Sequence, residues 1–484
     1  MGINLTIIYR VTGFLFMVFS PVLVLPIVIS LWNQDGLSHY FILSFIVQFS
    51  IGLLIWYPYR NQKYSLRRRE GFLVVVVFWI LLSLLGASIF VFVLNLSYVD
   101  AIFESVSGLT TTGATVITGL DNLPASILFY RQELQWFGGM GLIMLAVAIM
   151  PMLGIGGMKM YLAETPGPMK EEKMTPRIVN SAKLLWVIYL GLTILCALAY
   201  WLAGMSPFDA ISHSMSTLST GGFSTHDDSI GYFNSTAIDY IAIVFMLVGG
   251  INFSVHFLVL QNRSLKYYWQ NTEVKIFLLF VLFMVFFVTL SLHLTSHQST
   301  FFEELKNAAF EIVSVVTSTG FGLADFSVWP LYLPVLMIFI SFVGGCGGST
   351  AGGMKVMRVS MLIKLVWHEI KKLIHPHGVF IIKFGGYQVS RNIQQNILGF
   401  FSIYAITFVF LMFLMMMVTD VDQITAFSAI ATSMNNLGPG LGEVTQNFNS
   451  ISSVGKMIAA SAMLLGRLEV FSILVLFHPL FWRT

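Results

Sequence analysis

The sequence predicts an all-α polytopic membrane protein, in which four span–pore helix–filter loop–span repeats surround a pseudo-fourfold pore, preceded by two extra transmembrane helices. Three observations predict it: an apolar composition, long apolar runs, and a segment that recurs four times. Of the 484 residues, 56% are hydrophobic and 10% are charged, and the mean hydropathy is +0.81. A soluble chain of this composition would lack the polar residues to cover its surface, whereas runs of about 20 apolar residues cross a bilayer core.

The apolar runs predict ten spans, and the first is too long for a signal peptide and lacks a clear cleavage site, so it is expected to be retained. In chain order the spans are 8–31, 40–57, 71–95, 131–152, 181–203, 237–260, 274–294, 331–374 (interrupted), 395–418 and 457–480. They group into an N-terminal two-helix region and four pore repeats. These are residues 1–70, then 71–160, 176–265, 270–378 (with an intramembrane loop at 344–353) and 390–484.

Charged residues divide unevenly between the two sides of these spans. Of the 26 Lys and Arg, 20 fall near the termini or in the segments 58–70, 153–183, 263–275 and 364–391. The positive-inside bias predicts that this side, with both termini, is cytoplasmic. Of the 23 acidic residues, 16 fall on the other side or near an external pore mouth, which favours cations there. Exclusion of basic residues from that side explains part of the same acidic excess.

The recurring segment is 16 residues long and aligns without gaps. Its copies are DAIFESVSGLTTTGAT (100–115), DAISHSMSTLSTGGFS (209–224), NAAFEIVSVVTSTGFG (307–322) and, more loosely, TAFSAIATSMNNLGPG (425–440). In this register four glycines coincide, namely Gly113, Gly222, Gly320 and Gly438. Every copy lies between two apolar runs, and such a repeat is a signal at the level of the fold. Four ordinary external loops are the alternative, but loops alone do not carry one register with glycine at a fixed place.

Each copy predicts a short helix that enters the membrane and a loop that turns back. Irregular backbone is tolerated at membrane depth only where protein or a water-filled cavity surrounds it. A helix of about 11 residues spans roughly half the membrane, and its C-terminal dipole favours a cation at the loop. Glycine permits positive φ, and a ring of carbonyls can replace the hydration shell of a large monovalent cation. Thr and Ser hydroxyls add neutral ligands, whereas a ring of Glu would be expected for divalent ions.

The stretch GGCGGSTAGGMKVMR at 344–358 interrupts one span. Six glycines in ten residues cannot sustain a helix exposed to lipid, so the stretch must line a cavity on the cytoplasmic side of Gly320. A phosphate-binding loop is disfavoured, because no Lys directly follows the final glycine and no strand precedes. A tight packing site for a crossing helix remains an alternative. Arg467 lies inside the last span and must face protein or water; a structural arginine tied to Glu469 or to a helix end is the alternative.

These residues resemble the Trk/Ktr/HKT superfamily of potassium transporters, and specifically its bacterial Trk-type membrane subunit. The resemblance covers essentially the whole chain. Beside the repeated segments it rests on five motifs, which are MPMLGIGGMKMY (150–161), ETPGP (164–168), TPRI (175–178), GGCGGSTAGGMKVMR (344–358) and LLGRLEVF (464–471). It implies potassium uptake across the bacterial inner membrane through one gated pore per chain, a homodimer, and a cytoplasmic ring of nucleotide-binding regulatory subunits. Potassium ions in the filter are the only bound groups it implies, and none is held covalently.

The resemblance also assigns residues to two roles. The potassium-binding filter comprises Thr111, Thr112, Gly113, Thr220, Gly221, Gly222, Ser318, Thr319, Gly320, Asn436, Leu437 and Gly438. The gate comprises Gly345, Cys346, Gly347, Gly348, Ser349, Thr350, Ala351, Gly352, Gly353 and Arg467. Glycine at position 113 goes with potassium selectivity in the family. The fourth filter, NNLGPG, departs from the Thr/Ser-Gly pattern, so looser selectivity or fewer ion sites are expected.

Other functions remain as alternatives. An intramembrane serine protease would need Ser349 opposite His256, and it would leave the four glycine loops unexplained. An alternating-access transporter usually shows inverted repeats, whereas these repeats run in one direction. Whether uptake is passive or coupled to protons or sodium, and how selective it is among monovalent cations, stays open. The isolated pair His375 and His377 has no third ligand nearby, and nothing indicates a nucleic-acid partner.

Overall fold

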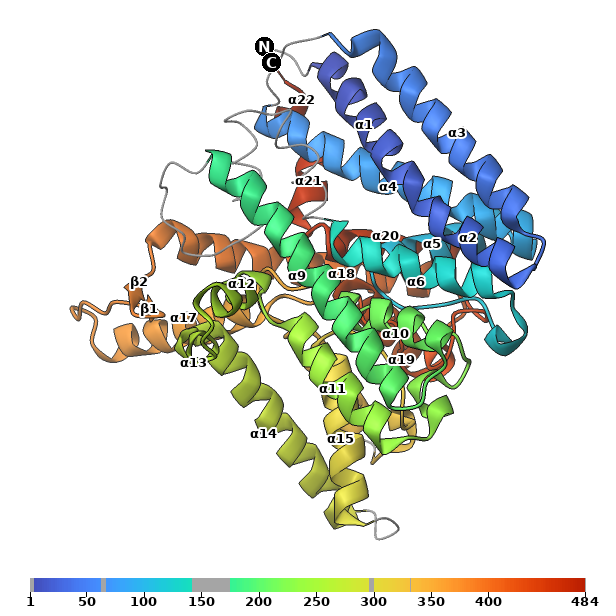
Figure 1. Ribbon diagram of the computed structural model, residues 1–484. Helices are drawn as coiled ribbons and strands as arrows, with labels where there is room; N and C mark the ends of the chain where they lie inside the picture. Colours follow the sequence, from blue (N-terminus) through green and yellow to red (C-terminus); the bar gives the residue numbers. More distant parts are fainter. Residues whose placement is uncertain (1–3, 62–66, 142–174, 296–299, 331, 484) are drawn as a thin grey trace.

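The computed structural model describes residues 4–61, 67–141, 175–295, 300–330 and 332–483 (Figure 1). The helices in the first half of the chain are α1 (Leu5–Phe19), α2 (Val24–Asn33), α3 (Ser38–Trp56), α4 (Arg68–Leu94), α5 (Tyr98–Leu109), α6 (Ala125–Gly139), α9 (Thr175–Leu202), α10 (Pro207–Ser219) and α11 (Thr236–Gly250). Those that follow are α12 (Phe253–Asn262), α13 (Lys266–Gln270), α14 (Thr272–Thr295), α15 (Phe301–Val316), α16 (Tyr332–Ser341), α17 (Val356–Ile374), α18 (Arg391–Val418), α19 (Gln423–Asn435), α20 (Ser453–Arg467), α21 (Phe471–Phe477) and α22 (Pro479–Trp482).

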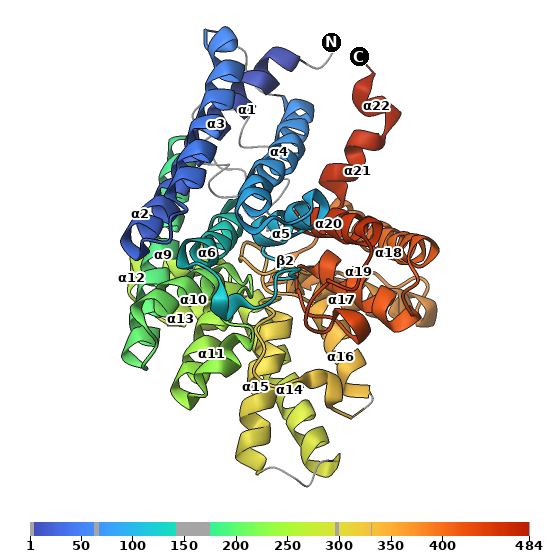
Figure 2. The ribbon, with the colours of Figure 1, turned by 90° about the vertical axis from the view of Figure 1, so that its right-hand side faces the viewer.

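The molecule is a multi-span helical protein. In the described part of the chain, six helices are long and apolar enough to cross a membrane, or eight if each of two bent pairs is one span. The first span joins α1 and α2 through a turn of 3-10 helix at Ser20–Leu23, where Pro21 is accommodated at the start of the turn. The two chain termini lie close together (Figures 1 and 2), and Arg69 near the start of α4 donates a hydrogen bond to the carbonyl of Arg483.

Two spans expected to be continuous are broken. The span at 237–260 is α11 and α12, which meet at 98° across Ile251 and Asn252. Ile251 ends α11 and Asn252 starts α12, because the Asn252 side chain accepts a hydrogen bond from the amide of Ser254 and caps the helix. The span at 457–480 is α20 and α21, which meet at 111°. Apolar periodicity does not reveal such breaks, since both halves remain apolar.

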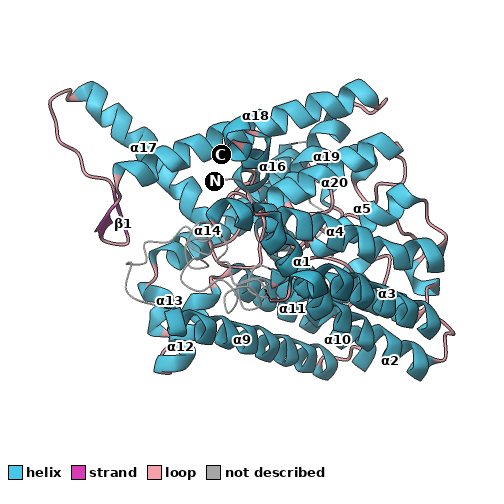
Figure 3. Ribbon diagram, turned by 90° about the horizontal axis from the view of Figure 1, so that it is seen from above, coloured by secondary structure: helices cyan, strands magenta, loops and turns pink. Residues whose placement is uncertain are grey.

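Smaller differences concern boundaries and strands. The span expected at 131–152 begins earlier, at Ala125, and its end lies outside the described residues, as do the motifs at 150–161 and 164–168. The expectation of an all-α chain misses one short hairpin, β1 (Lys383–Phe384) paired with β2 (Tyr387–Gln388). Its two turn residues, Gly385 and Gly386, both have positive φ, as a tight hairpin requires. Seen from above, the hairpin and α17 extend from the edge of the molecule (Figure 3).

Four short helices organise the rest of the fold. Each packs between the helix before it and the helix after it: α5 between α4 and α6, α10 between α9 and α11, α15 between α14 and α16, and α19 between α18 and α20. The second helix of each group also packs on the short helix of the next group, in the pairs α6–α10, α11–α15, α16–α19 and α20–α5. The last pair returns to the first group, so the four groups form a closed circle.

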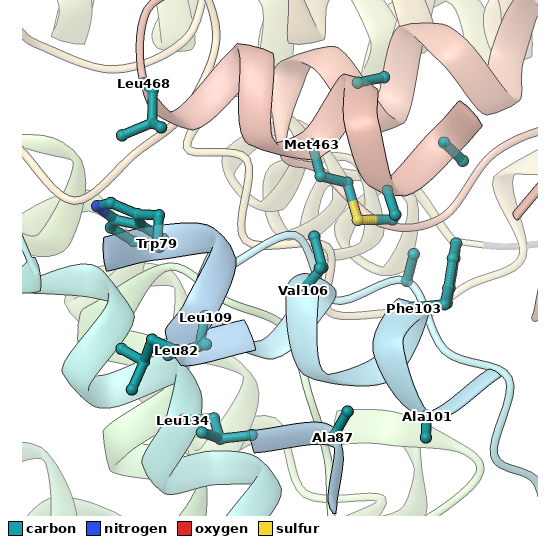
Figure 4. Packing of buried hydrophobic residues seen from close by; sticks show 14 of the residues in the cluster. Trp79, Leu82, Ala87, Ala101, Phe103, Val106, Leu109, Leu134, Met463 and Leu468 are labelled. Carbon is teal, nitrogen blue, oxygen red and sulfur yellow. The ribbon is translucent and has the colours of Figure 1, made fainter. Parts of the chain in front are cut away.

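Apolar side chains hold this circle together between groups. In Figure 4, Met463 of α20 points toward Val106 of α5, and both side chains are buried. Leu109, at the end of α5, is buried near Leu82 of α4 and Leu134 of α6. The end of α5, where the chain leaves the helix, is therefore fixed from several sides by packing of the kind found in protein interiors.

Candidate functional site

The four short helices start and end in the same way. Each begins after a capping side chain that accepts a hydrogen bond from the backbone amide three residues later. The caps are Ser97, Ser206, Thr300 and Asp422. Such caps satisfy amides that an isolated helix start leaves unpaired. The C-terminal end of each helix leads directly into one loop, which we name loop 1 (110–113), loop 2 (219–222), loop 3 (317–320) and loop 4 (435–438).

The loops share an unusual backbone. The residue two positions before each aligned glycine is left-handed, with φ of 56° at Thr111, 51° at Thr220, 53° at Ser318 and 53° at Asn436. The glycines themselves have φ of 82° at Gly113, 80° at Gly222, 78° at Gly320 and 98° at Gly438. Glycine is the residue that adopts such angles at least cost. The register aligned in the sequence therefore corresponds to one repeated conformation.

The loops also form a closed ring of close backbone contacts. A Cβ on each glycine would collide with the carbonyl oxygen of the residue that precedes the glycine in the next loop. The pairs are Gly113 with Gly221, Gly222 with Thr319, Gly320 with Leu437, and Gly438 with Thr112. The four glycines line one cavity of about 110 Å³. Glycine is thus needed at each position for two independent reasons, the sign of φ and the lack of space.

Loop 4 joins this ring through different side chains. The Asn436 amide nitrogen donates to the hydroxyl of Thr112 over 3.0 Å and so ties loop 4 to loop 1. Asn435 turns outward, where it accepts a hydrogen bond from Tyr404 at 2.6 Å and donates to Ser341 at 2.8 Å. The replacement of hydroxyl residues by asparagines, visible in the sequence, therefore supports the same ring with other contacts.

A non-helical segment separates α16 from α17, and we call residues 342–355 the interrupting loop. Its Thr350 hydroxyl donates to the carbonyls of Leu218 and Gly249, each at 3.0 Å. Its Gly352 amide donates to the hydroxyl of Ser318 at 2.5 Å, and its Gly353 amide donates to the carbonyl of Asn435 at 3.1 Å. The interrupting loop therefore contacts the ends of three of the four short helices or the loops that follow them.

Arg467, the last residue of α20, contacts the interrupting loop directly. Its two terminal nitrogens donate to the carbonyl of Thr350 at 2.9 Å and to the carbonyl of Gly138 at 2.8 Å. It therefore links the interrupting loop to α6. Glu469 does not pair with it but accepts from Arg358 at 2.6 Å, so a tie of Arg467 to Glu469 is wrong. A break in the helix at 468–470 separates the two charges. The other form of that alternative, a tie to a helix end, agrees with the contact to Gly138 in the last turn of α6.

The two basic residues of the motif at 344–358, Lys355 and Arg358, hold the C-terminal end of the interrupting loop. Lys355 donates to the carbonyl of Ala351 within the loop. Arg358, in the first turn of α17, also lies over the ring of Phe400, 4.2 Å from its centre. Glu273 accepts from the Gly347 amide at 2.7 Å, so this glycine-rich segment is held by polar contacts at several points.

Several buried residues behind the ring were not singled out as site residues from the sequence. Glu104 accepts from the Val116 amide at 3.0 Å and pairs with the buried Arg131, whose nitrogen lies 2.8 Å away. Glu311 accepts from the amides of Leu323 and Ala324, both at 2.9 Å. Glu104 and Glu311 occupy the same position in the aligned segments, so the alignment alone could have identified them as candidate site residues. Gln135, which contacts loop 2, had no such signal because it lies outside the repeat.

The polar surface outside the ring includes a hydrogen bond between His226 and the exposed Asp121. The ring nitrogen of His226 lies 2.5 Å from a carboxylate oxygen of Asp121. This hydrogen bond holds the pKa of Asp121 below its usual value of 3.8. His226 also lines the cavity shared by the four glycines.

The rival constellations are not assembled. Ser349 donates to the carbonyl of Cys346 at 2.6 Å, while both ring nitrogens of His256 are engaged by Tyr268 and the carbonyl of Val248. No nucleophile–base pair therefore forms between Ser349 and His256. Across the residues that the structure describes, no group of three His, Cys, Asp or Glu side chains is arranged to hold a metal ion.

Taken together, the closed circle of helices and the ring at its centre define a multi-pass membrane transport protein. A family model described as TrkH, cation transport protein, matches residues 37–483. The chain is 49% identical over 482 residues to the Trk system potassium uptake protein TrkH of Vibrio parahaemolyticus, with 99% of each chain covered. It is 37% identical over 484 residues to the Trk system potassium uptake protein TrkG of Escherichia coli, with 99% of each covered.

A solved structure gives the same result. The crystal structure of the potassium transporter TrkH from Vibrio parahaemolyticus matches with a TM-score of 0.90 and 46% identity, covering 99% of this chain and 100% of that one. The chain therefore belongs to the TrkH family of cation transport proteins. It is a membrane transport protein of the bacterial Trk type and not an enzyme.

Proposed function

We propose that the chain carries out potassium uptake through a single gated pore that passes through the ring of four loops. The observation that carries this proposal is the closed ring, in which four glycines of positive φ line one cavity. Ring carbonyls can replace the hydration shell of potassium without a fixed negative charge. The relatives, whose names describe potassium uptake, support the same substrate.

The residues aligned as a filter would supply the ligands. Potassium ions would bind between the carbonyls and hydroxyls of Thr111 to Gly113, Thr220 to Gly222, Ser318 to Gly320 and Asn436 to Gly438. No other bound group is required by this proposal. The buried ends of the short helices direct their negative dipoles at the same place, which favours a cation there.

The interrupting loop, residues 345–353 above all, would act as the gate together with Arg467. Its support is the hydrogen bonding from Thr350 and Gly352 to the neighbourhood of loops 2 and 3. The guanidinium of Arg467 adds a positive charge that repels cations from the passage. In this proposal uptake begins when the interrupting loop moves away from loops 2 and 3. The hydrogen bond between Arg467 and the Thr350 carbonyl is then either kept or broken.

The architecture would be four pore repeats, 71–160, 176–265, 270–378 and 390–484, after an N-terminal two-helix region at 1–70. The circular order of helix contacts supports this division. The charge distribution supports a bacterial inner-membrane location with both termini in the cytoplasm. A homodimer and a cytoplasmic ring of nucleotide-binding regulatory subunits complete the proposal, on the resemblance to Trk systems.

Two alternatives share the same ring. One is uptake coupled to protons or sodium, and the other is a less selective pathway for monovalent cations. The unequal side chains of loop 4, with asparagines and Leu437 in place of hydroxyl residues, favour the second alternative over strict selectivity.

Rubidium influx into proteoliposomes of the purified chain, competed by potassium and by sodium, tests the proposal. Gly113→Ser should weaken discrimination by about tenfold or more, because a side chain there meets both an unfavourable φ and the carbonyl of Gly221. Gly119→Ser is the matched control, since Gly119 has φ of 73° but open space around it. Equal competition by sodium and potassium in the wild-type protein would support the less selective pathway. Absence of influx, even after deletion of residues 345–353, would refute the pore.

A further inference from the structure

Loop 2 differs from loops 1 and 3 at the residue that precedes the glycine. Loops 1 and 3 have threonines there, and each hydroxyl bonds to another threonine two residues earlier. Thr112 bonds to Thr110 at 2.7 Å, and Thr319 bonds to Thr317 at 2.8 Å. Loop 2 has Gly221 at this position, so it lacks the hydroxyl pair that stiffens the other two loops.

The side chain of Gln135 occupies the space that a side chain at position 221 would need. Gln135 lies on α6, in the preceding group of helices, and is completely buried. A Cβ on Gly221 would collide with the carboxamide carbon of Gln135. Gly221 is not among the residues of positive φ, so space and not backbone conformation requires glycine there.

The carboxamide of Gln135 makes three hydrogen bonds, to α10, to loop 2 and to the residue that follows loop 2. Its nitrogen donates to the carbonyl oxygen of Gly221 at 2.6 Å. Its oxygen accepts from the Ser216 hydroxyl at 2.6 Å and from the Phe223 amide at 3.0 Å. These three partners fix which end of the carboxamide is oxygen, because the Phe223 amide can only donate and the Gly221 carbonyl can only accept.

The acceptor of this hydrogen bond is one of the four ring carbonyls. The Gly221 oxygen is the atom that a Cβ on Gly113 would meet. The equivalent carbonyls belong to Thr112, Thr319 and Leu437, and in the described part of the chain none of these three accepts a hydrogen bond from a side chain. One carbonyl of the ring is thus held, and partly neutralised, from outside the repeat that carries it.

We propose that Gln135 is a positioning residue for ion discrimination, which fixes the Gly221 carbonyl in the ring and replaces the threonine pair missing from loop 2. This inference rests on the proposed function of the ring as a potassium filter. A carbonyl that is held by a buried donor moves less when a smaller ion binds. A smaller ion such as sodium then gains less from the ring closing around it.

The first test separates the hydrogen bonds from packing. Two variants are compared in the rubidium influx assay. Gln135→Met keeps most of the side-chain volume but removes all three hydrogen bonds, whereas Gln135→Ala removes the volume and the hydrogen bonds together. Each variant should reduce the preference for potassium over sodium by about tenfold, which corresponds to about 1.4 kcal/mol and is in the range for losing one buried hydrogen bond. Gln132→Ala is the control, because Gln132 is equally buried on α6 and its carboxamide bonds to no described residue. If Gln135→Met discriminates as the wild-type protein does, Gln135 only fills space and the proposal is wrong.

The second test is a reciprocal rescue that guards against misfolding. Gly221→Thr alone should lose most of its influx, because the new side chain collides with Gln135. The double variant Gln135→Ala with Gly221→Thr should recover influx and discrimination to within about threefold of the wild-type values, since a threonine at 221 can pair with Ser219 as Thr112 pairs with Thr110. A double variant no better than Gly221→Thr would overturn the proposed exchange. A wild-type protein without potassium-competed influx would instead refute the pore itself.

Discussion

The glycines of the ring and Gly347 of the interrupting loop are the same residue type in two different environments. At Gly113, Gly222 and Gly320 a Cβ would overlap a backbone carbonyl of the next loop. At Gly347 the nearest atom to a Cβ would be a side-chain oxygen of Glu273, 3.6 Å away. The ring is thus closed by backbone packed against backbone at every aligned glycine. The interrupting loop is packed in the same way at Gly352, against the Asn435 carbonyl, but has room beside Gly347.

This difference bears on which part of the molecule moves. Backbone atoms in contact around a closed ring cannot separate at one point without disturbing all four loops. Hydrogen bonds from a loop, by contrast, can break one at a time, and each contributes about 1 kcal/mol net. This difference fits the proposed roles of the ring in selection and of the interrupting loop in gating, although both are rich in glycine.

The largest expected effect comes from the same substitution made in both regions. Gly320→Ala should abolish potassium-competed rubidium influx or reduce its selectivity at least tenfold, because φ of 78° and the Leu437 carbonyl both oppose a methyl group. Gly347→Ala should keep selectivity within about twofold of the wild-type value, since φ is ordinary there and space is present. Equal loss of selectivity in both variants would contradict the comparison.

A smaller effect is expected from weakening the interrupting loop. Arg467→Gln removes charged hydrogen bonds to the Thr350 and Gly138 carbonyls, each worth roughly 1.5–3 kcal/mol. Influx in the absence of regulatory subunits should rise about tenfold, with the preference for potassium over sodium unchanged. Lys456→Gln is the control, because Lys456 lies on the same helix but pairs with Asp100 instead. A change in selectivity without a change in resting influx would assign Arg467 to the ring and not to the gate.

Much of this arrangement follows from the sequence because it repeats. The short helices, the register of the four glycines and the interruption after α16 were all predicted, since each depends on local composition. The breaks at Asn252 and near Glu469 were not, because apolar residues on both sides conceal them. Gln135 and the Arg358–Glu469 pair were missed for another reason: their partners are distant in the chain, and only the closed circle of helices brings them together.

The smallest effect is expected where a polar contact is most exposed. Asp121, 44% exposed, accepts a hydrogen bond from His226 that lowers the pKa of the carboxyl from 3.8. Because the folded-state pKa is depressed, this pair stabilises the fold above pH 3.8, and the stabilisation is lost as the pH falls through the folded-state pKa. Asp121→Asn should therefore lower the free energy of unfolding at pH 7 by less than about 1 kcal/mol, and the difference should vanish in more acidic buffer.

Thermal unfolding of the detergent-solubilised protein at several pH values measures this difference, with the exposed neighbour Asp228→Asn as the control. A loss as large as that expected from breaking the Arg467 contacts would mean that exposure is a poor guide to which polar contacts matter here. The distinction between the ring and the interrupting loop would then need a cause other than burial. A loss confined to less than about 1 kcal/mol would instead order the three kinds of contact by burial: close backbone packing in the ring, buried hydrogen bonds of the interrupting loop, and exposed hydrogen bonds near the cavity.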